Sequence, residues 1–259
     1  MHSPGRILHA GAIIPFALAM TAGTAPGQIL MDRDPVRLEY VIRAGESTVD
    51  SVGTFAVSFE PTDTPSGRRL LVHAVTQFGI ELLGAQEHHS KIDLVCDKTG
   101  LESFAVSASS GERTVEHTAN RKEETIVVRS LVDGKKASAT IPSSVLRTDL
   151  GLYCGAFLAE SLADGPMMRD FPLLVPASGG HAPRQKFREG ILRILHRGQP
   201  VRTMVSRIVQ SEGPPDRYWH TLDEWQLCLR RETVIGGTPF VFELAKVNGE
   251  PYRVESDSR

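Results

Sequence analysis

The stretch CLRRETVIGGTPFVFELAK, residues 228–246, predicts two antiparallel strands joined by a two-residue turn. Gly236 and Gly237 can both adopt the positive φ of a tight hairpin turn, and β-branched and aromatic residues flank them. This loop length predicts the cross-strand pairs Ile235–Thr238, Thr233–Phe240, Arg231–Phe242 and Leu229–Leu244 on one side, and Glu232–Val241 and Arg230–Glu243 on the other. One side is mostly apolar and the other mostly polar, which is typical of an antiparallel sheet wetted on one face.

The same alternation with a period of two recurs along much of the chain. It is seen in VRLEYVIRA (36–44), GTFAVSFE (53–60), RRLLVHAVTQFGIELLG (68–84), SKIDLVC (90–96), LESFAVSAS (101–109), ERTVEHTAN (112–120) and ETIVVRSLV (124–132). Turn sequences such as SSGE, VDGKK and IGGT separate these runs. The spacing favours antiparallel meanders over βαβ units.

Two segments depart from this pattern. In residues 148–165, TDLGLYCGAFLAESLADG, apolar residues recur at helical spacing, Asp149 can cap the start and Gly165 follows the end, so we expect a helix. Residues 185–210 fit either a helix or a hairpin, and Gly190 together with the RGQ turn favours the hairpin. The expected fold is therefore mainly β: a single curved antiparallel sheet, an unclosed barrel, with one or two helices on its concave face.

The composition is that of an ordinary globular protein. The 259 residues are 41% hydrophobic and 23% charged, and the formal net charge is −2. Neither the charge nor the 6% aromatic content suits a nucleic-acid-binding surface, so no nucleic-acid partner is expected.

The first 27 residues have the layout of a secretory signal peptide. Arg6 precedes an apolar run from Ile7 to Met20, and small residues follow between Ala19 and Gly27. The run is too short to span a bilayer. We therefore expect export, removal of residues 1–27, and one β-rich periplasmic domain over residues 28–259 without a membrane span.

Three cysteines, Cys96, Cys154 and Cys228, would enter an oxidising compartment, where at most two can pair within the chain. A Cys96–Cys154 disulfide is preferred, a Cys154–Cys228 disulfide is nearly as plausible, and three buried free thiols remain an alternative.

Motifs for catalysis or metal binding are weak. His88 and His89 lie near Asp93 and Cys96, but neighbouring residues of a strand point to opposite faces, so a metal site is not expected. The motif DKTG, Asp97–Gly100, matches part of an ATP-phosphorylated pump motif and is interpreted as a β-turn. SGGH, residues 178–181, lacks the strand-to-helix elbow of a hydrolase nucleophile. No catalytic residue and no cofactor is assigned.

A curved sheet with an apolar helix against it can form a groove for acyl chains or for an apolar segment of a partner; a simply packed core is the alternative. The side chains expected to line such a groove are Phe55, Phe59, Phe78, Ile80, Phe157, Phe240 and Phe242.

Three stretches carry a resemblance to known families: LEYVIRAGESTVDSVGTFAVSFE (38–60), LLVHAVTQFGIELLG (70–84) and DRYWHTLDEWQLCLRRETVIGGTPFVFELAK (216–246). Over residues 36–130 and 200–246 the chain resembles secreted bacterial families of unknown function that share the unclosed β-barrel of the lipoprotein carrier LolA. The resemblance implies a curved antiparallel sheet that handles lipid, lipoprotein or envelope partners without catalysis.

The expected function is accordingly non-enzymatic binding of a hydrophobic small molecule, a lipid or an envelope protein in the periplasm. One alternative is an exported hydrolase that uses His88, His181 or His220 as a base. Another is an accessory protein of a secreted complex.

Overall fold

The structure is a computed structural model that describes residues 33–45, 51–80, 86–142, 148–157, 168–170, 173–182, 184–209, 213–235 and 237–253. The expected signal peptide, residues 1–27, lies outside the described residues.

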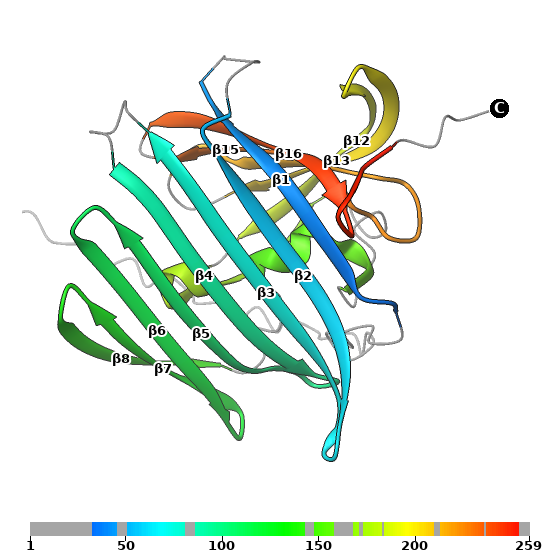
Figure 1. Cartoon of the computed structure of the whole chain (residues 1–259). Coiled ribbons are helices and arrows are strands. Elements are labelled where there is room, and N and C mark those ends of the chain that lie inside the picture. The colour runs from blue at the N-terminus through cyan, green and yellow to red at the C-terminus, as the bar shows by residue number, and fades with distance from the viewer. Residues whose placement is uncertain are drawn as a thin grey trace, which may run out of the picture.

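Most of the described chain forms one curved antiparallel sheet. Its first half is a meander of β1 (Val36–Ala44), β2 (Gly53–Thr64), β3 (Gly67–Ile80), β4 (Gln86–Asp97), β5 (Gly100–Ser110), β6 (Arg113–Lys122), β7 (Thr125–Val132) and β8 (Lys135–Pro142). Its second half contains β9 (Met168–Asp170), β12 (Gln185–His196), β13 (Gln199–Val209), β14 (Asp216–His220), β15 (Cys228–Ile235), β16 (Thr238–Val247) and the short β17 (Glu250–Pro251). Figure 1 shows the meander as a broad twisted layer with β12 and β13 curling at one end.

The two halves join where β1 pairs with β16. The strand order is β8-β7-β6-β5-β4-β3-β2-β1-β16-β15-β14-β13-β12-β9, with β17 beside β16, and β8 and β9 form the two ends. These fifteen strands therefore make one antiparallel sheet that does not close into a barrel, as the sequence predicts.

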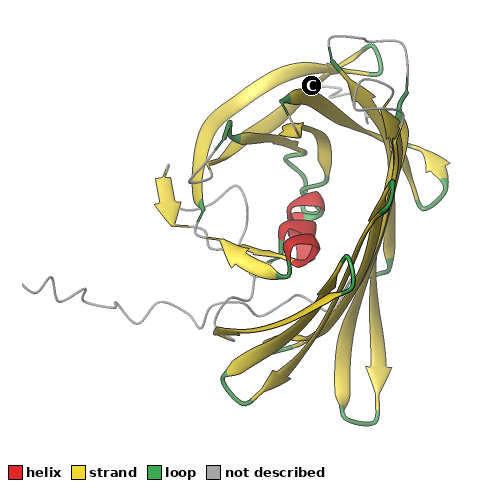
Figure 2. Ribbon diagram, turned by 90° about the vertical axis from the view of Figure 1, so that its left-hand side faces the viewer, coloured by secondary structure: helices red, strands yellow, loops and turns green. Residues whose placement is uncertain are grey.

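The apolar and polar residues that alternate in the sequence lie on opposite faces of this sheet. In β1, Leu38, Tyr40 and Ile42 are buried, whereas Arg37 is exposed. The inward residues of both halves form one core, and Figure 2 shows the sheet curving around the short helical segment that fills its concave side.

The expected helix over residues 148–165 is wrong. Its described part forms two short 3₁₀ helices, η2 (Asp149–Tyr153) and η3 (Gly155–Phe157), and no α-helix occurs among the residues that the structure describes. Gly151 and Gly155 weaken a regular helix. Cys154 breaks the segment by pairing with Leu227 in an isolated antiparallel bridge. Residues 158–165 lie outside the described residues.

Both expected hairpins are confirmed. In the β15–β16 hairpin, Ile235 pairs with Thr238 and Arg231 with Phe242, and Gly237 has φ 83°. Gly236 lies outside the described residues. The described part of the other expected hairpin, residues 185–209, forms the β12–β13 hairpin, which bulges between Arg188 and Gly190.

A second, two-stranded sheet of β10 (Leu173–Val175) and β11 (Gly180–Ala182) is connected by the 3₁₀ helix η4 (Pro176–Ser178). Within the described parts of the chain, no helix has the length and apolar character needed to cross a bilayer.

Candidate functional site

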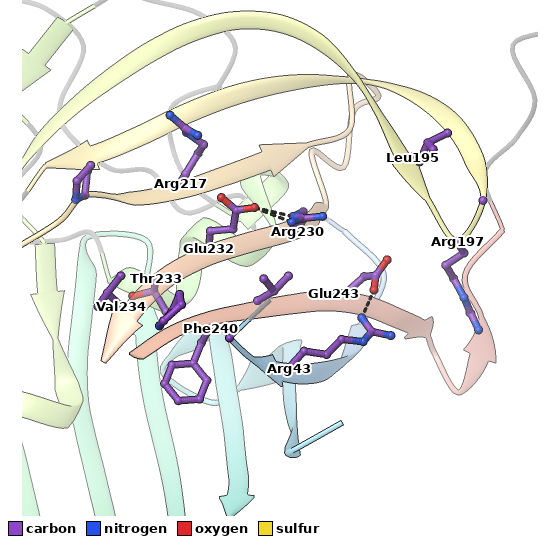
Figure 3. Close-up of a pocket in the computed structure, with 15 residues that line it drawn as sticks. Arg43, Leu195, Arg197, Arg217, Arg230, Glu232, Thr233, Val234, Phe240 and Glu243 are labelled. Carbon is purple, nitrogen blue, oxygen red and sulfur yellow. Dashed lines mark hydrogen bonds and ion pairs between the residues drawn. The ribbon is translucent and has the colours of Figure 1, made fainter. Parts of the chain in front are cut away.

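A candidate site is a cleft of about 800 Å³ on the outer face of the sheet, the face away from the η2–η3 segment. The end of the β12–β13 hairpin forms one side of it, and β1, β14, β15 and β16 form the rest (Figure 3). We call it the outer cleft; its lining comprises Arg43, Gly45, Leu195, Arg197, Gly198, Pro215, Arg217, Arg230, Glu232, Thr233, Val234, Pro239, Phe240, Val241 and Glu243.

Strand alternation places charged side chains on this outer face. In Figure 3, Glu243 and Phe240 point to opposite sides of β16, and Phe240 is buried in the core. Arg230 and Glu232 share the outer side of β15 in the same way, because Arg231 between them is directed into the interior. The polar face that the hairpin sequence predicts is therefore the floor of the outer cleft.

A tryptophan holds two of the arginines in place. The guanidinium of Arg217 lies 5.8 Å from the centre of the Trp219 ring, and that of Arg230 lies 5.6 Å from it. Both distances are within the range of cation–π attraction. Arg217 also contacts Glu189 with its Nε at 3.0 Å from Oε2. These contacts preorganise two cationic groups at the cleft.

The ion pairs within the cleft differ from the expected cross-strand pair. Arg230 and Glu243 are opposite in the register, as predicted. However, Arg230 Nη2 lies 2.6 Å from Oε1 of Glu232 on its own strand, and Glu243 pairs with Arg43 of β1. The reason is that the sequence of the hairpin alone does not reveal the third strand, β1, which supplies a competing cation.

The cleft carries excess positive charge. Four arginines line it, namely Arg43, Arg197, Arg217 and Arg230, against two glutamates, Glu232 and Glu243. The Nε atom of Arg43 is buried without a hydrogen-bond partner, and Arg197 donates to the carbonyl oxygen of Ala245 at 3.0 Å. The chain as a whole has a net charge of −2, so this excess is local.

Apolar groups lie beside these cations. Leu195, Val234, Pro215, Pro239 and Val241 line the same cleft, and Leu195 and Val234 are exposed to solvent. The arrangement offers both hydrogen-bond donors for an anionic group and an apolar surface for a hydrocarbon chain.

The groove residues expected on the concave face do meet there, but they pack against one another. Five of them, Phe55, Phe59, Phe157, Phe240 and Phe242, are buried in the core. Phe78 is partly buried at its margin, and the side chain of Ile80 lies outside the described ones. Their role in ligand binding stays a prediction, and it requires displacement of the η2–η3 segment that fills this face.

A buried polar cluster fixes that segment to the sheet. Arg231 donates to Tyr153 OH at 2.6 Å and to Asp216 Oδ2 at 2.8 Å, and Thr233 donates to Asp216 Oδ1 at 2.6 Å. The Arg231 guanidinium also lies 5.3 Å from the centre of the Phe242 ring. A charged residue in the core is thus paired and hydrogen-bonded, as burial of charge demands.

Asp149, at the start of η2, lies near this cluster. Burial raises the pKa of Asp149 to about 6, although Arg231 opposes the rise, and its Oδ1 atom has no hydrogen-bond partner. The carboxyl group is therefore more easily protonated in the folded chain than in the unfolded one.

The hydrolase alternative names His88, His181 or His220 as the base, and the structure describes the surroundings of two of these side chains. Burial lowers the pKa of His220 to about 4, and its Nε2 donates to the carbonyl oxygen of Leu152 at 2.7 Å. Because His220 is fully buried, a substrate has no access to it. His88 packs on Phe78, with ring centres 4.7 Å apart, and the side chain of His181 is not among the described ones.

The weaker motifs have ordinary structural roles. Among the described residues, no group of three or more His, Cys, Asp or Glu side chains is placed to hold a metal ion. Asp97 closes the predicted turn between β4 and β5 by accepting a hydrogen bond from Thr99 N at 2.8 Å. Burial alone would raise the pKa of Asp97, but hydrogen bonds from Arg121 and Thr99 lower it to about 2. This is the environment of a turn held by an ion pair.

The three cysteines are buried free thiols, so the preferred Cys96–Cys154 disulfide is not formed in this structure. Cys96 lies on β4, whereas Cys154 lies beside Leu227, just before β15, and its thiol contacts the carbonyl oxygen of Trp225 at 3.5 Å. The two residues thus occupy different elements with different partners. Burial raises the pKa of each thiol to about 12.

The outer cleft was missed as a site by reasoning from the sequence. Its four arginines come from β1, the β12–β13 turn, β14 and β15, which are distant in the chain. The feature of the sequence that could have indicated this cleft was the set of charged residues on the polar side of the β15–β16 hairpin, Arg230, Glu232 and Glu243.

Comparison with known proteins supports the fold. No protein-family model matches the sequence, and no curated protein matches it. Among solved structures, the chain is similar to the crystal structure of a beta-barrel-like protein of domain of unknown function DUF1849 from Brucella abortus, at 12% identity and a TM-score of 0.54. The match covers 85% of this chain and 98% of that one. At this identity the likeness shows a shared barrel-like β architecture.

Proposed function

We propose that this protein is a non-enzymatic binding protein of the periplasm whose outer cleft holds a lipid-like amphiphile by its anionic group and part of its hydrocarbon chain. The observation that carries the proposal is the combination of four arginines and an apolar wall in one cleft of about 800 Å³. Small-molecule sites in proteins occupy roughly 300–1,000 Å³, so the cleft has a suitable size for one headgroup and a chain segment.

The charges of the cleft define the class of ligand. A carboxylate or phosphate would gain charge-assisted hydrogen bonds from Arg217 and Arg230, whose guanidinium groups are already ordered by Trp219. Preorganised donors reduce the entropy lost on binding. Leu195 and Val241 would contact the apolar part of the ligand.

The compartment is part of the proposal. It is supported by the sequence of residues 1–27, which has the charge, apolar run and small residues of a signal peptide. The resemblance to LolA-like unclosed barrels agrees with a task at the cell envelope.

The test has two parts. Organic extracts of the protein from its native host are analysed by mass spectrometry for anionic amphiphiles. The purified protein is then titrated with an anionic lysophosphatidylglycerol and with zwitterionic lysophosphatidylcholine, below their micelle concentrations, and binding is followed calorimetrically.

We expect the anionic lipid to bind more tightly, and R230Q to weaken it by roughly 10- to 100-fold, because a hydrogen bond to a charged group contributes about 1.5–3 kcal/mol. R113Q is the matched control, since Arg113 lies at the exposed end of β6. Equal affinity for both lipids, or equal losses in R230Q and R113Q, would exclude the outer cleft as the binding site.

A further inference from the structure

The β12–β13 hairpin carries a second feature that the outer cleft does not require. Ile191 and Leu195 on β12 are 55% and 71% exposed, and Arg193 between them is exposed as well. The cross-strand partner of Arg193 is Arg202 of β13, also exposed. We call these four residues, Ile191, Arg193, Leu195 and Arg202, the hairpin face.

The two arginines of this face lack acidic partners. Like charges directly opposite each other in a sheet destabilise the pair. Among the described residues, neither Arg193 nor Arg202 forms an ion pair, while the nearby carboxylate of Glu189 is engaged by Arg207 and Arg217. The positive charge of the face is thus uncompensated within the described chain.

The shape of the hairpin presents this face outward. The bulge between Arg188 and Gly190, where Gly190 has φ 122°, bends β12. Beyond it the two strands curl away from the meander (Figure 1). On the opposite side of the same strands His196, Val201 and Thr203 are buried, and Leu192 is 51% exposed, so that side is largely but not wholly covered.

We propose that the hairpin face docks the protein onto an anionic lipid bilayer. Exposed aliphatic side chains interleaved with arginines match a lipid interface, where the apolar groups enter the headgroup–acyl boundary and the cations meet phosphates. A docking surface for a folded protein would instead be enriched in aromatic residues, and the hairpin face has no aromatic residue.

The face adjoins the outer cleft. Leu195 belongs to both, and Arg197 at the hairpin turn lines the cleft. Docking through the hairpin would bring the cleft to the bilayer surface, from which an amphiphile could enter. Bilayer docking itself does not depend on the proposed ligand of the cleft.

The experiment is co-sedimentation of the full chain with vesicles of phosphatidylcholine alone and with vesicles of an equimolar mixture with phosphatidylglycerol. We expect binding to the anionic vesicles that weakens with added salt. The charge variant R193Q/R202Q should lower the partition coefficient by roughly 25-fold, about fivefold per arginine. I191S should also lower it, because it removes an inserted side chain. All three substituted residues are exposed, and thermal melting checks that each variant is folded.

Matched controls separate the hairpin from general surface effects. V75S replaces an exposed apolar residue on β3, and R113Q removes an exposed cation from β6, and both should bind like the wild type. The cleft variant R230Q should also keep vesicle binding, and R193Q/R202Q should keep binding of the anionic lysolipid, so the two proposals can fail separately.

The proposal would be overturned by equal binding to both vesicle types, by no binding, or by equal losses in hairpin and control variants. Loss of self-association in the hairpin variants without vesicle binding would overturn it in favour of a second copy of the chain.

Discussion

The ring of Phe157 stacks on that of Phe59, with centroids 4.9 Å apart and planes inclined by only 7°. Phe157 belongs to the η2–η3 segment and Phe59 to the concave face of β2. The concave side of this open sheet is therefore filled by the η2–η3 segment of the chain itself, and the outer cleft lies on the other face.

This stacking predicts that F157A destabilises the protein by about 3–5 kcal/mol, because a buried aromatic ring is lost and leaves a cavity. Urea unfolding followed by tryptophan fluorescence measures the change. M168A on β9 is the control, since Met168 is exposed and its loss should change stability by less than about 0.5 kcal/mol. A similar small effect for F157A would mean that the segment is not docked on the sheet.

The buried pair of Arg231 and Asp216 predicts a non-additive double mutant. R231M should destabilise by about 3–5 kcal/mol, because it leaves the buried carboxylate of Asp216 without a cation, with only the hydroxyl groups of Thr233 and Tyr218 as side-chain donors. R231M/D216L removes both charges and should recover a large part of that loss. Chemical denaturation of the wild type and both variants checks this, and a double variant less stable than R231M would contradict it.

Asp149 predicts a pH dependence with a definite sign. Its folded pKa of about 6 exceeds the unfolded value of 3.8, so between these pH values the folded state binds more protons. The contribution of Asp149 to stability therefore falls as the pH rises from about 4 to 6. D149N should be more stable than the wild type at pH 7, by up to about 3 kcal/mol, and the difference should vanish near pH 4.

Denaturant unfolding at several pH values measures the effect of D149N. D63N is the control, because Asp63 is an exposed residue of β2. A stability difference between D149N and the wild type that is constant from pH 4 to 7 would show that Asp149 does not titrate in this range.

The buried cysteines predict slow thiol chemistry. In the folded protein we expect little reaction with Ellman's reagent at pH 8, because Cys96, Cys154 and Cys228 are buried and few thiolates form when the pKa is about 12. After unfolding without reductant, all three thiols should react. One reactive thiol per unfolded chain would instead reveal a disulfide.

Local patterns in the sequence were sufficient for strands β1 to β7 and for both hairpins, but not for β8 or for the short strands β9, β10 and β11. The Gly236–Gly237 turn and its alternating flanks determine the register in which Ile235 meets Thr238. Gly190 and the turn at Gly198 likewise distinguish the β12–β13 hairpin from a helix. In these elements the residues that decide the structure are close together in the chain.

The η2–η3 segment shows where this reasoning fails. Leu150, Tyr153 and Phe157 recur at helical spacing because each of them is buried in the core. The neighbouring Leu152 and Ala156 are buried too, so the segment is buried on several sides. The spacing of its apolar residues therefore does not distinguish an α-helix from another buried conformation.

The outer cleft could not be derived from local patterns, because it depends on the long-range pairing of β1 with β16. That pairing brings Arg43 next to Glu243, 200 residues later. The hairpin sequence alone instead suggests that Glu243 pairs with Arg230. The charge of a side chain was evident from the sequence, but its partner and the cleft around it depend on strand order.

The pairing of β1 with β16 also determines the order in which the chain can assemble. Strands β1 to β8 can pair with their neighbours as they are synthesised, but one flank of β1 must wait until almost the last strand is made. Until then its backbone amides and carbonyls present a template for association with other chains. A nascent molecule shortened before Thr238 would lack the strand that joins its two halves, and is expected to aggregate.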